Sequence, residues 1–322
     1  MENLAANPAA GAVSDSRPPA VVAAFTAAIA ALGLERPSIT ELEGGATNRS
    51  FRLRDAGHDY VLRIAGAATP GLGASRASEF AMQAIAASAG LAPGIVLADP
   101  ERDFIVTRHA DGRVPDISEM RAAPLLGRVG AWIARLHALA PPRGLAVVDF
   151  GERAAGYLER CLGQERRADI AAIAVELERR RSALPPVRHL TACHHDLHHR
   201  NFVVSGERIV AVDWEYAGPG DPAADLACCI GYHELDATQI DCLLEGYGNK
   251  SAGFRARVEA LGWIFNCLWF GWNEAAASAG LETDPKLQAK LAARLALPAR
   301  CAAHGRDHHH RSRRRRSSRE RP

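Results

Sequence analysis

The 322-residue chain has no run of 18 apolar residues and no pair of cysteines in CxxC spacing. The first absence argues against a membrane-spanning helix. The seven cysteines are odd in number and lie mostly in apolar segments, so we expect reduced, buried thiols in a cytoplasmic protein rather than a disulfide framework. Because 48% of the residues are hydrophobic, the chain is too apolar to be disordered and can form one large or two-lobed core.

The net charge of +2 conceals an uneven distribution of charge. Residues 300–322 contain nine arginines against two acidic residues, which leaves 30 basic and 35 acidic groups in residues 1–299. The folded part is therefore mildly acidic and carries no footprint for nucleic acid, and we expect neither nucleic acid nor a membrane as a partner. We predict that residues 1–17 and the Arg/His-rich tail 300–322 are disordered, and we assign no function to the tail.

Short strand-like runs fill much of the first third of the chain. Alternating or β-branched runs, separated by turns that contain glycine, predict strands at 39–42, 50–54, 60–64, 95–98 and 103–107. Helical spacing predicts helices at 20–33 and 75–89. The order of strands, helix and strands predicts a small antiparallel sheet that carries one helix.

From residue 108 onward the pattern is mostly helical. Apolar residues recur at helical spacing in 125–139, 151–182, 222–231, 237–246, 255–279 and 285–297. Residues 189–216 interrupt this pattern with strand and loop character. We expect the chemistry of the protein there, because reactive groups tend to lie on loops that a rigid scaffold holds in place.

The interruption contains the motif H-x-D-L-x-x-x-N, in which His194 is followed by Asp196 and Asn201. Two short strands come next, joined by a turn at 205–208, and the second strand ends at Asp213. Because a hairpin brings its open ends together, we expect Asn201 and Asp213 to lie side by side, with Asp196 close by. Hard oxygen ligands for Mg²⁺ and a nearby free carboxylate are what phosphoryl transfer requires.

This segment resembles the catalytic loop and metal-binding aspartate of the kinase-like fold, and specifically of the aminoglycoside phosphotransferase/choline kinase family. The run 212–216 is similar to that of choline, ethanolamine and thiamine kinases, as is 220–222 followed by 225–227. The resemblance implies a two-lobed, protein-kinase-like α+β fold. A small antiparallel-sheet lobe with one main helix, residues 1–107, would grip ATP, and a larger helical lobe, residues 108–299, would carry the catalytic loop and the acceptor pocket.

The N-terminal half agrees with this resemblance. A glycine-rich loop corresponds to the phosphate-covering hairpin of the family, and Arg63 stands at the nucleotide-binding position, with Glu79 on the following helix as its partner. The residues that would bind ATP are Gly44, Gly45, Thr47, Asn48, Arg63 and Glu79. For Arg63 and Glu79 the alternative is an ordinary surface salt bridge.

The resemblance implies transfer of the γ-phosphoryl group of ATP to the hydroxyl of a small, cationic metabolite such as choline, ethanolamine or thiamine. Asp196 would orient and deprotonate the hydroxyl, His194 would brace the loop, and Asn201 and Asp213 would hold Mg²⁺. The alternatives are an aminoglycoside-type antibiotic phosphotransferase and a non-catalytic nucleotide-binding relative. A polar turn beside a surface hairpin is the alternative without any chemistry.

Two features of the sequence bear on the acceptor. Residues 209–249 contain no Lys or Arg but eight acidic residues, among them Glu215, and their field would favour a cation. Trp269 and Trp272 share a predicted helix face with Phe265, where they would form an aromatic wall for an ammonium group. The alternative for these aromatic side chains is ordinary core packing.

Two further groups of residues have structural and functional interpretations. A zinc site is suggested by four clustered histidines, but no Cys or carboxylate set completes the ligands, and the following strand argues for a loop. These histidines are His194, His195, His198 and His199. Asp221 and Asp225 are predicted to be structural, tying the loop after Asp213 to the start of the next helix.

Overall fold

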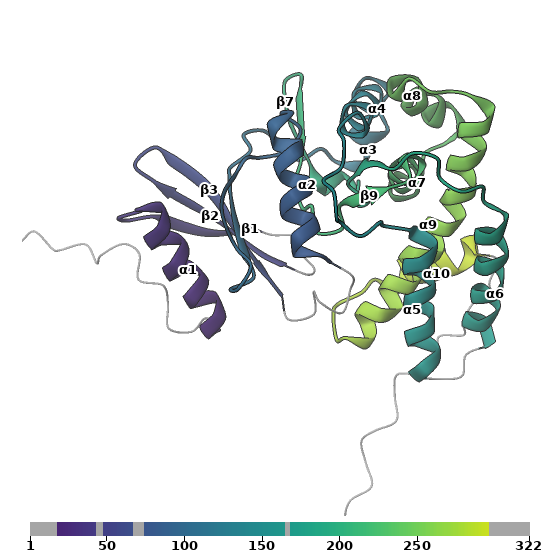
Figure 1. Cartoon of the computed structure of the whole chain (residues 1–322), viewed down its shortest axis with the longest axis horizontal. Helices are drawn as coiled ribbons and strands as arrows, with labels where there is room; N and C mark the ends of the chain where they lie inside the picture. The colour runs from purple at the N-terminus through teal and green to yellow at the C-terminus, as the bar shows by residue number, and fades with distance from the viewer. Residues whose placement is uncertain (1–17, 43–47, 67–73, 165–167, 296–322) are drawn as a thin grey trace, which may run out of the picture.

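The structure is a computed structural model that describes residues 18–42, 48–66, 74–164 and 168–295 (Figure 1). The predictions for residues 1–17, for Gly44, Gly45 and Thr47, and for the tail 300–322 lie outside the described residues.

The N-terminal part of the chain is built on a five-stranded antiparallel sheet. Its strands are β1 (Ser38–Leu42), β2 (Asn48–Asp55), β3 (His58–Ala65), β4 (Ile95–Asp99) and β5 (Phe104–Arg108). They lie in the order β1-β2-β3-β5-β4, so that β3 is central. Tyr60, Leu62 and Ile64 of β3 are buried, which is the alternation of a strand with one face on a core.

Two helices accompany this sheet. In Figure 1, α1 (Pro19–Leu32) lies at the outer end of the molecule, whereas α2 (Arg76–Ser88) stands between the sheet and the helical part. The ring of Phe25 in α1 packs edge-on against Phe51 of β2 with 4.8 Å between the ring centroids, inside a hydrophobic cluster that α1 and the sheet share. Met82 of α2 belongs instead to the large cluster of the helical part, so α2 connects the two parts.

The rest of the chain is mostly helical. Its helices are α3 (Ile117–Arg121), α4 (Ala123–His137), α5 (Phe150–Gln164), α6 (Ala168–Ala183), α7 (Pro222–His233), α8 (Ala237–Tyr247), α9 (Ala252–Ser278) and α10 (Pro285–Arg294). The prediction of a single helix over 151–182 is wrong, because α5 and α6 pack against each other and both pack against α9. One straight helix of that length would extend about 48 Å and could not fold back on itself as α5 and α6 do.

Short strands interrupt the helices where the sequence predicts it. β6 (Thr191–Cys193) pairs with β9 (Gly218–Gly220), and β7 (Phe202–Ser205) forms a hairpin with β8 (Arg208–Ala211). The loop 194–201, which ends in the short 3₁₀ helix His199–Asn201, joins β6 to β7.

A buried carboxylate of α7 holds this loop. Asp225 is fully buried and accepts hydrogen bonds from the backbone N–H of His194 at 2.9 Å, the backbone N–H of His195 at 2.6 Å, and Nε2 of His137 at 3.1 Å. Burial by itself raises the pKa of Asp225, but the hydrogen bond from His137 and the proximity of His195 outweigh burial and lower the pKa to about 2. Asp225 is structural, but the prediction that it ties the loop after Asp213 to the next helix is wrong, because its carboxylate accepts from the backbone at 194 and 195.

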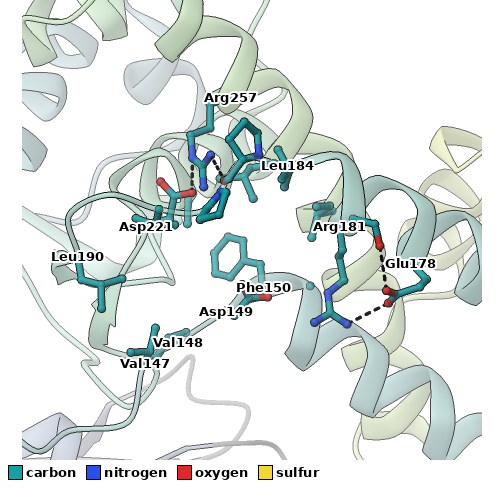
Figure 2. A pocket seen from close by; sticks show the side chains of 18 residues that line it. Val147, Val148, Asp149, Phe150, Glu178, Arg181, Leu184, Leu190, Asp221 and Arg257 are labelled. Atoms are coloured by element: carbon teal, nitrogen blue, oxygen red, sulfur yellow. Dashed lines mark hydrogen bonds and ion pairs between the residues drawn. The ribbon is translucent and has the colours of Figure 1, made fainter.

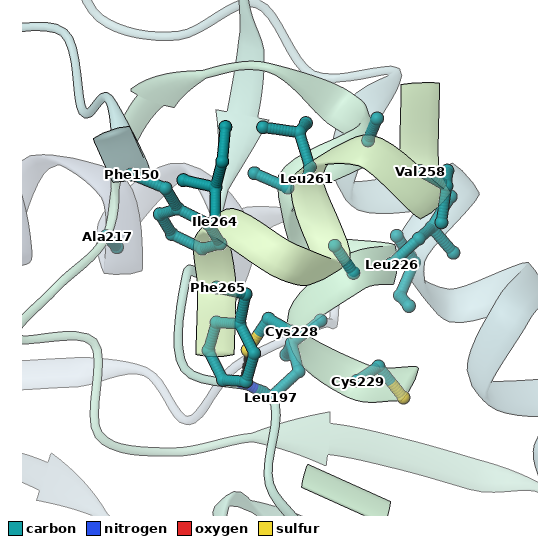
Figure 3. Packing of buried hydrophobic residues seen from close by; sticks show 14 of the residues in the cluster. Phe150, Leu197, Ala217, Leu226, Cys228, Cys229, Val258, Leu261, Ile264 and Phe265 are labelled. Atoms are coloured by element: carbon teal, nitrogen blue, oxygen red, sulfur yellow. Dashed lines mark hydrogen bonds between the residues drawn. The ribbon is translucent and has the colours of Figure 1, made fainter. Parts of the chain in front are cut away.

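The loop is also anchored by its one apolar residue. Leu197 is fully buried, and Figure 3 shows it in the packed cluster with Cys228 and Phe265. Its backbone N–H points to Sγ of Cys228 at 3.2 Å. The polar residues on either side of Leu197 are therefore attached to a rigid core.

The predicted two-lobed α+β architecture is confirmed by the sheet, its helices and the mostly helical remainder. The six cysteines of the described residues form no disulfide there, and five of them are buried, as predicted. No helix of the described ranges is both long and apolar enough to cross a bilayer.

The crossing of α4 and α8 depends on small residues. A Cβ on Gly130 would lie 2.3 Å from the carbonyl oxygen of Leu243 and 2.8 Å from the nitrogen of Tyr247. We expect Gly130→Ala to lower the free energy of unfolding by about 2 kcal/mol, because backbone atoms cannot move aside cheaply. Gly262→Ala in α9 is the matched control, since a Cβ there meets nothing within 4 Å, and it should stabilise by about 0.5 kcal/mol. Urea unfolding of both variants measures the difference, and equal stabilities would contradict the close crossing.

Removing the charge of Asp225 should destabilise the protein in a pH-dependent way. We expect Asp225→Asn to cost about 2–4 kcal/mol at pH 7, because buried backbone N–H groups then face an amide. Since the folded-state pKa of Asp225 lies below that of an unfolded aspartate, its stabilisation is complete above pH ~4 and is lost as the pH falls towards 2. The difference in the free energy of unfolding between the wild type and Asp225→Asn should therefore be smaller at pH 3 than at pH 6 in chemical unfolding. Asp284→Asn, at the exposed cap of α10, is the control with little effect at any pH. A gap that does not depend on pH would contradict this assignment.

Candidate active site

His194 links the loop to the strand that leads to Asp213. Its Nε2–H donates to the carbonyl oxygen of Val212 at 3.0 Å, and its ring lies 4.6 Å from that of Trp214. The side chain is fully buried, and burial lowers the pKa of His194, so the imidazole is neutral. This contact is of the kind expected from a residue that braces the loop.

Asp196 lies between two hydrogen-bond donors. Nδ2 of Asn201 donates to its Oδ2 at 2.8 Å, and the hydroxyl of Tyr232 donates to its Oδ1 at 2.7 Å. Burial raises the pKa of Asp196 to about 6, against the two hydrogen bonds, which lower it. A carboxylate that is held in place and has a raised pKa is a candidate for a general base.

The hairpin brings Asp213 to Asn201. Phe202 pairs with Ala211 across the hairpin, and beyond this pair the N–H of Val212 donates to the carbonyl oxygen of Asn201 at 2.9 Å. Asp213 is the next residue, and its φ of 62° is in the left-handed region that residues other than glycine rarely adopt. Such backbone strain occurs often at functional sites.

Arg63 connects the sheet to Asp213. Its Nη1 donates to Oδ1 of Asp213 at 2.7 Å, and its Nη2 forms an ion pair with Glu79. The side chain of Arg63 is 11% exposed and that of Glu79 is fully buried, which excludes the surface salt bridge that was the alternative. Arg76 forms a second ion pair with Glu79. It was missed in the sequence, although its position three residues before Glu79 on one helix was a signal.

The N-terminal sheet also contacts the segment after Asp213 through Asn48. Nδ2 of Asn48 donates to Oε2 of Glu215 at 2.9 Å, and both residues are buried. Nη2 of Arg76 donates to Oδ1 of Asn48 at 3.2 Å. The roles predicted for Asn48 in ATP binding and for Glu215 in acceptor binding stay predictions, and the contacts of Glu215 lie towards the N-terminal sheet.

The oxygens left over at the hairpin suit a hard cation. Asn201 donates through Nδ2, and Asp213 accepts from Arg63 through Oδ1. Within the described residues, Oδ1 of Asn201 and Oδ2 of Asp213 have no hydrogen-bond partner. Amide and carboxylate oxygens are the ligands that Mg²⁺ prefers, so the donor set fits this ion.

The acidic residues of 209–249 are all engaged with other side chains or with a helix end. Three of them pair with arginine or histidine near the loop, and the others form surface ion pairs, cap helices or hydrogen-bond to an amide. The pairs are Asp213–Arg63, Glu215–Asn48, Asp221–Arg257, Asp225–His137, Glu234–Arg294, Asp236–Gln239, Asp241–Arg255 and Glu245–Lys250. Most of these charges thus have a cationic partner, whereas Glu215 and Asp236 accept hydrogen bonds from amide groups, and the field that would favour a cation stays a prediction.

The aromatic residues of α9 differ in burial and in their contacts. Phe265 is fully buried and belongs to the core. Trp269 and Trp272 are half-buried: the ring of Trp269 lies 4.7 Å from that of Tyr232, and Nε1 of Trp272 donates to the hydroxyl of Tyr216 at 3.1 Å. Trp269 also packs against the core cluster, and the hydroxyl of its neighbour Tyr232 bonds Asp196, so the role of the two tryptophans as an aromatic wall for an acceptor stays a prediction.

Tyr232 was missed in the sequence. It lies on α7 seven residues after Asp225, and residues seven apart share a helix face, which was the available signal. Burial raises the pKa of Tyr232 well above its usual range, so its hydroxyl keeps its proton and donates to Asp196.

The four clustered histidines do not form a metal site. Among the described residues, three or more such side chains have ligand atoms within 4.8 Å of one another in two groups, and neither contains these histidines. The groups are His137–Cys193–Asp225 and Asp59–His109–Asp111. Nδ1 of His198 accepts the N–H of Arg200 at 3.2 Å, which is a loop contact. The zinc interpretation is therefore rejected.

A cavity of about 300 Å³ lies behind the loop, between α5, α6 and the start of α7 (Figure 2). Its charged side chains pair with one another, as in the 2.6 Å hydrogen bond from Nε of Arg257 to Oδ2 of Asp221. Phe150 on its wall packs against the ring of His195 at 5.4 Å. Asp196 and Asp213 do not line this cavity, so it is separate from the candidate site.

Comparisons with known proteins agree with this geometry. The model of the phosphotransferase enzyme family matches residues 38–261. A choline/ethanolamine kinase family protein from Mesorhizobium loti is 28% identical, with a TM-score of 0.70 over 86% of this chain and 92% of that one. Choline kinase LicA from Streptococcus pneumoniae is 20% identical, with a TM-score of 0.72 over 86% of this chain and 99% of that one, which supports the fold.

A match in sequence covers less of the chain. Protein LicA of Haemophilus influenzae is 32% identical over 93 residues, which are 26% of this chain and 35% of LicA. The chain thus matches about a third of the length of this curated relative. The family match itself covers more than half of the chain and includes the described residues of the candidate site except Trp269 and Trp272 of α9. This chain belongs to the phosphotransferase enzyme family.

Proposed function

We propose that this protein transfers the γ-phosphoryl group of ATP, in the presence of Mg²⁺, to the hydroxyl of a small cationic metabolite of the choline, ethanolamine or thiamine kind. One observation carries the proposal: Asn201 donates to Asp196, Val212 next to Asp213 donates to the carbonyl oxygen of Asn201, and Arg63 donates to Asp213. Apart from Val212, which contributes only its backbone, these are a base, two oxygen ligands and a phosphate-binding cation, which is the set that phosphoryl transfer needs.

The residues of the site have different roles, which follow from their charges. Asn201 and Asp213 would hold the metal through their oxygens, and Arg63, held by Glu79, would bind phosphate oxygens. When bound, magnesium–ATP supplies the phosphoryl group and neutralises its developing charge. Asp196 orients the acceptor hydroxyl and takes its proton as the oxygen bonds to phosphorus. Positioning and charge neutralisation then account for most of the rate.

The N-terminal part of the chain, up to residue 107, is the ATP-gripping lobe of this proposal, and residues 108–299 carry the acceptor site. The described half of the phosphate-binding set comprises Asn48, Arg63 and Glu79, which meet at the edge between the two parts. A cytoplasmic location belongs to the same proposal, because ATP is present there and the buried cysteines form no disulfide among the described residues.

The choice of a cationic acceptor rests on the aromatic wall. Trp269 and Trp272 offer rings to an ammonium group, and such contacts are worth about 0.5–2 kcal/mol. An aminoglycoside-type antibiotic phosphotransferase is the second candidate, since an aminoglycoside is also a cationic polyol. A non-catalytic relative would need no carboxylate in the position of Asp196. ATP consumption with choline, ethanolamine, thiamine and aminoglycosides tests the three alternatives directly.

The roles of the two aspartates should separate experimentally. We expect Asp196→Ala to lower kcat by about 10²–10⁴-fold while magnesium-dependent ATP binding survives, because only the base is removed. Asp213→Ala should lose magnesium-dependent nucleotide binding. Calorimetric titration with ATP, with and without Mg²⁺, and steady-state kinetics provide the two measurements. Asp241→Ala, an exposed residue of α8, is the control. Retained turnover in both site variants would disprove the assigned roles.

The hydroxyl of Tyr232 should matter for the rate and not for ATP binding. We expect Tyr232→Phe to lower kcat about tenfold with the KM for ATP unchanged, because the lost charge-assisted hydrogen bond leaves Asp196 less well oriented. Tyr60→Phe is the matched control, since the Tyr60 hydroxyl bonds His58 in the N-terminal sheet. Steady-state kinetics of the two variants decide the question, and an unchanged kcat for Tyr232→Phe would refute the positioning role.

A further inference from the structure

Arg153, in the first turn of α5, differs from the other half-buried arginines of the described ranges. Twelve arginines in these ranges are half-buried, and eleven of them have a carboxylate within 4.0 Å. The eleven are Arg49, Arg52, Arg63, Arg76, Arg121, Arg128, Arg180, Arg181, Arg255, Arg257 and Arg294. Among the same described residues, the Arg153 side chain has neither an ion pair nor a hydrogen bond.

The surroundings of Arg153 are aromatic. Its guanidinium lies over the ring of Tyr216 with 5.6 Å to the ring centroid. Burial lowers the pKa of Arg153, but a guanidinium remains charged in proteins. A partly desolvated charge without a counter-ion costs free energy, which an anion from outside the chain would recover.

The nearest acidic residues in the sequence and at the site are already engaged. Asp149 caps α5 by accepting the N–H of Glu152 at 2.8 Å. Glu152 is exposed and adjacent to Arg153, and adjacent residues of a helix do not face each other. Asp213 is bonded to Arg63 at 2.7 Å. Arg153 is therefore left with its charge directed at the aromatic residues beside it.

A line of half-buried aromatic side chains connects Arg153 to the candidate base. Tyr216, under the guanidinium, accepts from Nε1 of Trp272 at 3.1 Å. Trp269 lies three residues earlier on the same face of α9, and its ring contacts Tyr232. The hydroxyl of Tyr232 then reaches Asp196. The wall that would hold an acceptor thus has a carboxylate at one end and an unpaired cation at the other.

We infer that Arg153 binds a carboxylate of the acceptor, so that the acceptor is a zwitterion with a hydroxyl, an ammonium group and a carboxylate. This inference rests on the proposed function, because it concerns the same acceptor site. The hydroxyl is presented to Asp196, the ammonium group lies against the tryptophans, and the carboxylate pairs with Arg153. Hydroxy amino acids and their N-methylated betaines belong to this class.

A carboxylate suits Arg153 better than a phosphate ester. The planar guanidinium matches the two oxygens of one carboxylate in a bidentate pair. A phosphate dianion carries about twice the charge, and Arg153 is the one half-buried arginine of the described residues that has no carboxylate of its own. A cation with no anionic group would instead be repelled from this end of the wall.

Matched pairs of acceptors test the inference, because the members of each pair differ in one carboxylate. The pairs are L-serine with ethanolamine, L-homoserine with 3-amino-1-propanol, and N,N,N-trimethyl-L-serine with choline. With ATP and Mg²⁺, we expect the full-length protein to prefer the carboxylated member by about tenfold or more in kcat/KM. Arg153→Gln should lower kcat/KM for the carboxylated member by about 10–100-fold, and Arg153→Lys by less.

The same variants should not impair other parameters. In Arg153→Gln the KM for ATP should stay within about twofold, and the kcat/KM for the uncarboxylated members should not fall, because a repelling charge is removed. Arg160→Gln, an exposed arginine on the same helix, is the matched control, and thermal unfolding checks that each variant is folded. A raised KM for ATP would mean that Arg153 serves the nucleotide and would overturn the inference.

Binding without turnover provides an independent measurement. In calorimetric titration with the carboxylated members, Asp196→Ala should bind like the wild type and Arg153→Gln should not bind. A wild type that neither binds nor phosphorylates any carboxylated member, or that prefers choline or ethanolamine, overturns the inference and leaves the proposed function standing. Conversely, the absence of ATP-dependent phosphorylation of every acceptor tested would refute the proposed function, whereas loss of carboxylate binding in Arg153→Gln would still support the assignment of Arg153.

Discussion

The position of the whole site depends on the hydrogen bonds that Asp225 accepts from the loop backbone. The N–H groups of His194 and His195 point to one buried carboxylate, and His195 adopts a left-handed φ of 65° to allow this. A buried carboxylate without donors would cost several kcal/mol, so the loop has one favourable position. Asp196 is the next residue, and Leu197 after it is fixed in the core. Because Asp196 is bonded to His195 and Leu197, the fixed positions of these two residues also fix Asp196, the candidate base.

The contact between the two parts of the molecule uses charges that a nucleotide would also need. Arg63 is shared by Glu79 and Asp213, and Arg76 neutralises the second oxygen of Glu79. Asn48 and Glu215 add a buried hydrogen bond between the sheet and the segment after Asp213. Because these groups are largely removed from water, their interactions are stronger than on the surface. The residues that we propose to bind the nucleotide therefore also join the sheet to the helical part.

On the acceptor side, the charged residues counted in the sequence are not the charges that stay unpaired in the folded protein. The acidic residues of 209–249 are numerous, yet most of them pair with cationic side chains of other helices and of the sheet, which weakens their field. Arg153 comes from a segment with no unusual charge and has no partner among the described residues. We therefore infer that the charges left unpaired after folding determine which acceptor binds, because paired charges cancel at short distance.

The sequence by itself determined the local features of this protein. Periods of about 2 and 3.6 residues indicate strands and helices without knowledge of the fold. The hairpin after Asp196 is close enough in the chain for its polar ends to be predicted together. The tertiary structure alone decided that 151–182 is two helices, which partners the acids take, and that Tyr232 reaches Asp196 across 36 residues. These contacts depend on how distant segments pack, and that packing is settled by the burial of the whole core rather than by any local pattern.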